Sequence, residues 1–161
     1  MNLLQACSPN VVTARRSTTI IDVARLMHDH HVGAVVVMDE GVPPRPVGIV
    51  TDRDIVLRVV ALAQEKIVTL AEQAMSTELV MVPGSTGIQE AVQLMRERGV
   101  RRLLVTGEEE FLKGIVSFDD LVAVLADQMG SMAQTIATGM LREEKRRVPA
   151  RWGRGHSASS T

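Results

Sequence analysis

Apolar and polar positions recur along the chain in two matching patterns. The stretch IIDVARLMHDHHVGAVVV (20–37) aligns with IQEAVQLMRERGVRRLLV (88–105) without a gap, so that Ile20 corresponds to Ile88 and Val37 to Val105. The same spacing places QACS (5–8) on QAMS (73–76). Because the spacing between the two copies is constant over these segments, the pattern indicates a structural repeat.

A third pair of matching segments closes each copy. GIVTDRDIV (48–56) and GIVSFDDLV (114–122) share an apolar frame around a hydroxyl residue and an aspartate. Their spacing is slightly smaller than that of the other segments, so the second copy has a shorter loop before its last strand, a change that loops tolerate. In each segment the hydroxyl and the aspartate have the spacing of a capping box at the start of a helix.

Each copy predicts the element order strand, helix, strand, strand, helix. Helical periodicity begins after Thr19 and Thr86, which we expect to act as caps together with Asp22 and Gln89. The predicted strands are 10–14, 34–37 and 47–50 in the first copy, and 79–83, 103–106 and 113–116 in the second. We therefore predict an α/β fold of tandem β-α-β-β-α repeats that pack together, because one copy cannot cover its own sheet. The predicted parts are repeat 1 (1–69), repeat 2 (70–127), a C-terminal helix (128–147) and a disordered tail (148–161).

The last third of the chain has a different pattern. From Leu121 onward one apolar stripe of a long helix runs through Leu125, Met129, Met132, Ile136 and Met140. This stripe either folds back over its own sheet or packs against a second subunit, and we favour the second subunit. The segment 142–154 carries six basic and two acidic residues. It suits contact with nucleic acid or an anionic surface, but a disordered, solvated end is the interpretation we favour.

The composition limits the classes of protein to which this chain can belong. With 161 residues, 45% hydrophobic content and a net charge of −1, the chain can bury one sizeable core. Aromatic residues make up only 2%, so we expect a core of Val, Leu, Ile, Ala and Met. Cys7 aligns with Met75, which favours a buried apolar role over a reactive thiol. No apolar run reaches the roughly 18 residues of a membrane span, and LLQAC (3–7) lacks the features of a signal peptide, so we expect a cytoplasmic protein.

Motifs of catalysis or metal binding are weak or missing. His28 and His31 stand three apart on one helical face, but no third ligand follows at a recognisable spacing, so we expect no metal site. PGSTG (83–87) lacks the features of a P-loop or a dinucleotide turn. No paired nucleophile and base appears. We therefore predict a protein that is not an enzyme.

The repeat resembles a pair of cystathionine-β-synthase (CBS) domains. The resemblance covers residues 1 to about 127 and rests on the repeat length, the element order, EAVQLM, GVRRLLV and the two Gly-x-x-[Ser/Thr]-x-x-Asp segments. It implies a pseudo-two-fold pair that binds adenosine-containing ligands in clefts between the copies, commonly as a dimer. Each capping box would then both cap its helix and bind ligand, since the cap carboxylate beside a helix N-terminus can also accept a hydrogen bond from a ribose hydroxyl.

The resemblance also implies candidate binding residues. Asp54 and Asp120 would accept ribose hydroxyl groups, with Thr51 and Ser117 beside them. The adenine would meet backbone groups near Val12, Thr13, Met81 and Val82. Arg53, Arg101 and Arg102 would approach phosphates, with Gly33 and Ala34 at the positions in the first copy that match the last two arginines. We expect Arg101 and Arg102 to serve the cleft of Asp120, so that the two clefts are not equivalent.

These observations predict a non-catalytic regulatory module that binds AMP, ADP or ATP and signals to a partner protein. NADH and S-adenosylmethionine are further candidate ligands, and no obligatory cofactor is expected. A homodimer is expected, with no membrane contact. A ligand-independent dimerisation scaffold is one alternative, and nucleic-acid binding through the basic tail is another.

Overall fold

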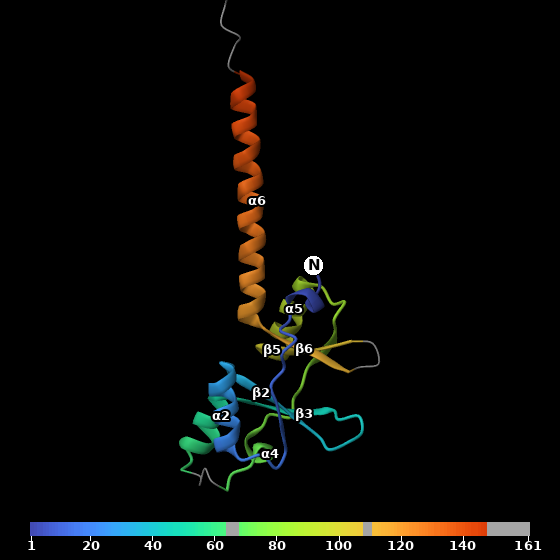
Figure 1. Cartoon of the computed structure of the whole chain (residues 1–161), viewed down its shortest axis with the longest axis vertical. Coiled ribbons are helices and arrows are strands. Elements are labelled where there is room, and N and C mark those ends of the chain that lie inside the picture. Colours follow the sequence, from blue (N-terminus) through green and yellow to red (C-terminus); the bar gives the residue numbers. More distant parts are fainter. Residues whose placement is uncertain (64–67, 108–110, 148–161) are drawn as a thin grey trace, which may run out of the picture. The chain divides into compact units, whose positions relative to one another are not determined.

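The computed structural model describes residues 1–63, 68–107 and 111–147 (Figure 1). The chain divides into two compact units, 1–122 and 123–161. The first unit contains the two predicted sheets and their helices. The predicted disordered tail, 148–161, lies outside the described residues.

The first repeat forms a three-stranded sheet in the order β1-β2-β3. β1 pairs with β2 in parallel, and β2 pairs with β3 in antiparallel orientation. The aliphatic run predicted as a strand supplies the buried centre, because Val35, Val36 and Val37 are at most 1% exposed. The elements are β1 (Thr13–Arg15), α2 (Ile20–His30), β2 (Ala34–Met38) and β3 (Pro46–Thr51).

The second repeat reproduces this sheet in the order β4-β5-β6. Its parallel and antiparallel pairings follow the same register, and both sheets carry an irregularity at matching places, after Val37 and after Val105. The elements are β4 (Met81–Pro83), α5 (Ile88–Arg98), β5 (Arg102–Thr106) and β6 (Leu112–Ser117). The prediction of tandem β-α-β-β-α repeats is therefore confirmed.

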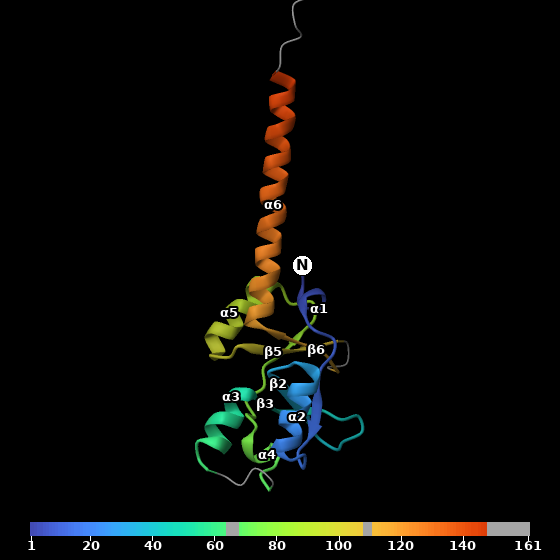
Figure 2. The same ribbon diagram turned by 60° about the vertical axis from the view of Figure 1, so that its left-hand side comes forward.

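The short helix α1 (Leu3–Ala6) begins the first repeat in sequence but packs on the second. The Leu3 N–H donates to the carbonyl of Thr86 at 2.9 Å, and the Ser8 N–H donates to the carbonyl of Ile115 at 3.0 Å. Figures 1 and 2 show α1, in dark blue, near β6. The side chain of Leu3 is fully buried there.

The matching helix α4 (Ala71–Ala74) makes the reverse crossing. The Ile20 N–H donates to the carbonyl of Thr69, and the Ser76 N–H donates to the carbonyl of Ile49, each at 2.9 Å. α4 therefore belongs to the core of the first repeat, although it falls within the predicted sequence range of the second. The two repeats exchange their leading segments.

The second helices of the two copies differ in conformation and length. In the first copy one turn of α-helix, α3 (Asp52–Asp54), continues as a π-helix, η1 (Ile55–Val60). In the second copy α6 (Phe118–Arg147) is a single α-helix of 30 residues. The prediction of a helix holds in both places, and the sequence pattern did not distinguish the wider π turn.

One of the two predicted caps on the first helices is confirmed. Thr19 caps α2, since its hydroxyl accepts from the Asp22 N–H at 3.2 Å. Thr86 does not cap α5, because the cap position is Gly87. The backbone of Thr86 is instead engaged by the crossing, where its carbonyl accepts from Leu3.

The core is aliphatic, as the composition predicts. Phe111 and Phe118 are 41% and 38% exposed, so these aromatic side chains contribute little. Three of the nine methionines, Met27, Met75 and Met95, are buried. Cys7, predicted to be buried, is partly buried and unpaired with another cysteine.

The second unit, from Ala123, contains the greater part of α6. No helix within the described ranges combines the length and the apolar character that crossing a membrane requires.

Candidate functional site

A first cleft lies between elements of both repeats and has a volume of about 260 Å³. The first repeat contributes the cap of α3, the second contributes the end of α5 and the start of β5, and the segment before β4 completes the wall. The lining residues are Ile49, Thr51, Asp54, Ser76, Glu78, Leu79, Val80, Gly99, Val100, Arg101, Arg102 and Leu104.

A second cleft of about 230 Å³ is built from the equivalent parts with the repeats interchanged. The lining residues are Ser8, Asn10, Val11, Val12, Val32, Gly33, Ala34, Arg102, Ile115, Ser117 and Asp120. Apart from Arg102, which is shared by both clefts, each of these positions is the repeat counterpart of a position in the first cleft. The pseudo-two-fold symmetry of the fold therefore produces two related clefts.

Each cleft contains one capping box. The Thr51 N–H and hydroxyl donate to Oδ2 of Asp54 at 2.9 and 2.7 Å, and the Asp54 N–H returns a bond to the Thr51 hydroxyl at 3.1 Å. Ser117 and Asp120 repeat this arrangement at 2.8, 2.6 and 3.1 Å. Both predicted capping boxes are therefore present, and each uses one carboxylate oxygen.

The second oxygen distinguishes the two carboxylates. Oδ1 of Asp54 lies 3.5 Å from Nε of Arg58, and the Asp54 side chain is only 16% exposed. Arg58 is itself held by the carbonyls of Ala74 and Met75 at 3.2 and 2.8 Å. The equivalent of Arg58 in the second copy is Val124. Asp120 is exposed, and within the described ranges its Oδ1 has no hydrogen-bond or ion-pair partner.

The positions of the two arginines correct one expectation. Arg101 lines the first cleft, with Asp54, and Arg102 lines both. The expectation that both serve only the cleft of Asp120 is wrong, because each cleft combines opposite repeats. Arg101 also pairs with Asp119 at 3.1 Å in an exposed salt bridge. The first cleft therefore has one more arginine than the second, and also one more carboxylate, that of Glu78.

Gly33 creates space in the second cleft. A Cβ at this position would lie 3.4 Å from a guanidinium nitrogen of Arg102 and 3.3 Å from a carboxylate oxygen of Asp52. The equivalent position in the second copy is Arg101. A glycine here lets Arg102 extend across the position that a side chain would otherwise fill.

The other predicted binding residues are distributed unevenly. Val12 and Ala34 line the second cleft. Met81, Val82 and Arg53 line neither cleft, and Val82 is buried in its sheet. Sequence reasoning missed the segment preceding β4 and part of its counterpart preceding β1. Applying the spacing of the repeat to Val12 would have identified Val80 as its counterpart.

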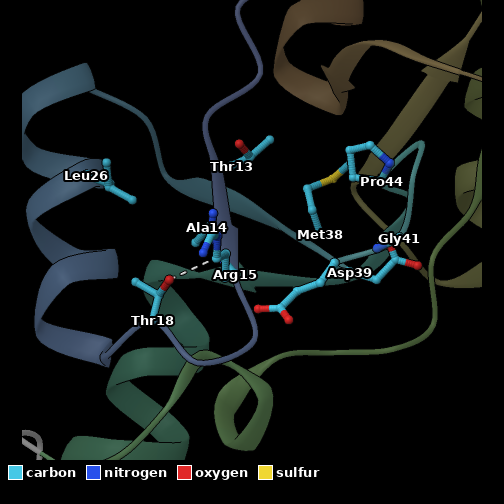
Figure 3. Close-up of a pocket in the computed structure, with 10 residues that line it drawn as sticks. Thr13, Ala14, Arg15, Thr18, Leu26, Met38, Asp39, Gly41 and Pro44 are labelled. Carbon is cyan, nitrogen blue, oxygen red and sulfur yellow. Dashed lines mark hydrogen bonds between the residues drawn. The ribbon is translucent and has the colours of Figure 1, made fainter.

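Thr13 lines a different and larger cavity, of about 760 Å³, on the first repeat (Figure 3). Leu26 and Met38 lie on its wall with Arg15, whose backbone N–H donates to the Thr18 hydroxyl at 3.0 Å. The carboxylate of Asp39 at its rim is already bound, since it accepts from two backbone N–H groups of its own loop. This open cavity has no convergent set of free polar groups among the described residues.

Among the described residues outside the clefts, Asp22 and Cys7 have shifted pKa values. The hydroxyl of Thr19, and then Arg25, lower the pKa of Asp22. Burial raises the pKa of the Cys7 thiol. His28 and His31 are exposed at the end of α2, and no cluster of three metal-ligating side chains occurs in the part of the chain that the structure describes.

Comparisons with known proteins point to one family. The family model of the CBS domain matches residues 4–61 and 71–127. The CBS domain-containing protein YhcV of Bacillus subtilis is 39% identical over 111 residues, which cover 69% of this chain and 76% of that protein. The protein MK0525 of Methanopyrus kandleri is 33% identical over 115 residues, covering 71% of this chain and only 58% of that protein.

A solved structure shows the same fold with a ligand. The CBS domain protein PAE2072 from Pyrobaculum aerophilum, complexed with AMP, aligns with a TM-score of 0.68 and 25% identity. The alignment covers 79% of this chain and 99% of that one.

Proposed function

The chain belongs to the CBS domain family, and from this premise we propose that it is a non-catalytic regulatory module whose two clefts bind adenosine-containing ligands such as AMP, ADP or ATP. The observation that carries the proposal is the pair of equivalent clefts, each with a cap carboxylate beside a helix N-terminus. The AMP complex of the similar protein PAE2072 supports this class of ligand.

The roles of the lining residues follow from their chemistry. Asp54 and Asp120 accept ribose hydroxyls, and Thr51 and Ser117 hold the carboxylates in position. The backbone segments before β1 and β4, which include Val12 and Val80, meet the adenine edge between aliphatic side chains. Arg53, Thr13, Met81 and Val82 have no part in this proposal, because they line neither cleft.

We assign different ligands to the two clefts because they differ in the number of arginines that line them. Arg101 and Arg102 line the first cleft, where two guanidinium groups suit a di- or triphosphate. Among its described lining residues the second cleft has one arginine, Arg102, and the Oδ1 of Asp120, which suits adenosine or a monophosphate. The ligand would change the geometry of the pair, and a partner protein would respond to this change. We propose that the working form is a homodimer in the cytoplasm.

Isothermal titration calorimetry with AMP, ADP, ATP, NADH and S-adenosylmethionine tests the proposal. The double variant Asp54→Ala/Asp120→Ala should lose binding by at least about tenfold, because each hydrogen bond to a charged group contributes roughly 1.5–3 kcal/mol. Asp29→Ala is the matched control, since Asp29 is an exposed carboxylate on α2 outside both clefts. Absence of binding to every compound in a folded sample would contradict the proposal.

A ligand-independent dimerisation scaffold is the second candidate. It is favoured by the first capping box, where Thr51 and Arg58 already engage both oxygens of Asp54. Under this alternative the clefts would contain only water. The same titration distinguishes the two candidates, because a scaffold releases no heat with any adenosine compound.

A further inference from the structure

One face of α6 carries large apolar side chains that are exposed. Met129, Met132, Ile136 and Met140 are between 60% and 71% exposed, and Leu125 is 37% exposed. None of these residues lines either cleft. Such a face is typical of an interaction surface, because isolated helices that face water are polar.

The spacing of this face is that of a helix-to-helix seam. Val122, Leu125, Met129, Met132 and Ile136 follow one another at alternating steps of three and four residues. This period of about 3.5 residues is the coiled-coil period, in which one helix packs along another. At about 1.5 Å per residue the five positions span about 21 Å.

The residues beside the seam are small or uncharged. No charged residue occurs from 128 to 141, although the helix is exposed over this stretch. Ala126 and Ala133 flank the seam, and small side chains let a second helix approach closely. A partner helix therefore meets no charged group along the middle of α6.

The two ends of α6 are complementary in charge. The first part carries Asp119, Asp120 and Asp127, and the segment 142–147 carries four basic and two acidic residues. Parallel pairing of two such helices would place like charges together. Antiparallel pairing in the register described below brings Arg142 of each helix level with Asp119 of the other, and it also opposes the two helix dipoles favourably.

We propose that α6 pairs with the same helix of a second copy in antiparallel orientation. In this register Met129 faces Met132 of the second copy, and Leu125 faces Ile136 of the second copy. The pairing is self-complementary, as a two-fold interface requires. It does not depend on nucleotide binding.

Disulfide cross-linking of the full chain tests the orientation. In a Cys7→Ser background, the double variant Leu125→Cys/Ile136→Cys should form a covalent dimer under mild oxidation, at least about fivefold more than either single variant. The two positions lie about 16 Å apart along one helix, so they cannot bridge within a chain. Equal cross-linking of the single variants would show parallel pairing and overturn the proposal, as would no cross-linking of the double variant.

Two substitutions that add the same charge test whether the seam is the contact surface. Adding Met132→Glu to the double variant should reduce the covalent dimer at least about tenfold, because it places two carboxylates in the seam. Gln134→Glu adds the same charge to the opposite face of the helix and should leave the yield unchanged. Equal effects of the two changes, with helix content intact by circular dichroism, would overturn the proposal.

Discussion

Cys7, which follows α1, packs directly over Gly114 of β6. A Cβ at Gly114 would lie 2.5 Å from Sγ of Cys7 and 2.9 Å from the carbonyl oxygen of Ser8. The equivalent pair joins Met75, which follows α4, to Gly48 of β3. Each sheet therefore needs a glycine where the leading segment of the other repeat crosses it.

We predict that Gly114→Ala lowers the free energy of unfolding by about 1–3 kcal/mol, as overpacking does. The added methyl group meets the backbone of Ser8, whose N–H and carbonyl pair with Ile115 at 3.0 and 3.1 Å. Gly48→Ala should cost less, because the three atoms nearest to its added Cβ belong to the side chain of Met75 rather than to the backbone. Urea denaturation measures both. Gly87→Ala is the control for added volume, since nothing lies within 4 Å of its added Cβ, and it measures only the cost of replacing the glycine at the cap of α5. A larger loss for Gly48→Ala than for Gly114→Ala would contradict the argument.

The two cap carboxylates should differ in their contribution to ligand binding. We predict that Asp120→Asn weakens adenosine binding by about tenfold or more, while Asp54→Asn has a smaller effect, because Arg58 already engages Asp54. Calorimetry with adenosine, which has no phosphate, isolates the ribose contact. Thermal unfolding should be followed in parallel, since each change also weakens a helix cap. Equal losses at the two sites would count against a role for the free oxygen of Asp120.

The arginines should control the response to phosphate. We predict that Arg101→Ala reduces the affinity for ATP in the first cleft alone, whereas Arg102→Ala reduces it in both. The loss should be about tenfold for each contact, as for a hydrogen bond to a charged group. Titrations with AMP and ATP on both variants measure this. Arg96→Ala on α5 is the control outside both clefts, and a loss of ATP binding in this variant would contradict the assignment.

His31 and Gly99 occupy the same position at the ends of α2 and α5. Both adopt the left-handed conformation, with φ of 53° and 64°. Glycine adopts this conformation without strain, whereas other residues are strained in it. We therefore predict that His31→Gly raises the free energy of unfolding by about 0.5–1 kcal/mol. This value is the relief of strain minus the cost of the larger conformational entropy that glycine gives the unfolded chain. Gly99→His should lower it by a similar amount. Thermal melts of both variants test the pair, and stabilisation by Gly99→His would contradict the reason given.

The thiol of Cys7 should react slowly. Burial raises its pKa, so less thiolate is present at neutral pH than in an ordinary cysteine, and thiolate is the reactive form. We predict that the rate of alkylation by iodoacetamide rises with pH along a curve displaced to higher pH in the folded protein. In urea the curve should return to that of an unstructured cysteine. Identical curves in the two conditions would show that the thiol is not shielded.

Sequence periodicity located both sheets, because their strands and bulges follow the spacing between the copies. It could not show which sheet each leading segment covers, since both sheets have a glycine at the same position, Gly48 or Gly114, against which the segment after α1 or after α4 could pack. For the same reason it could not place Arg101 in the correct cleft. The cap of α5 was placed one residue too early, because Thr86 suits a helix start, whereas the spacing of the repeat pairs Thr19 with Gly87 and would have placed the cap there.

The exchange of leading segments makes a single repeat incomplete. A fragment that contained only one sheet would carry the helix that covers the other sheet and lack the helix that covers its own. Two such fragments could satisfy each other by reciprocal exchange, as domain-swapped dimers do. Two repeats in one chain and two associated half-chains would therefore cover the same two sheets, and in this chain the repeats are covalently joined.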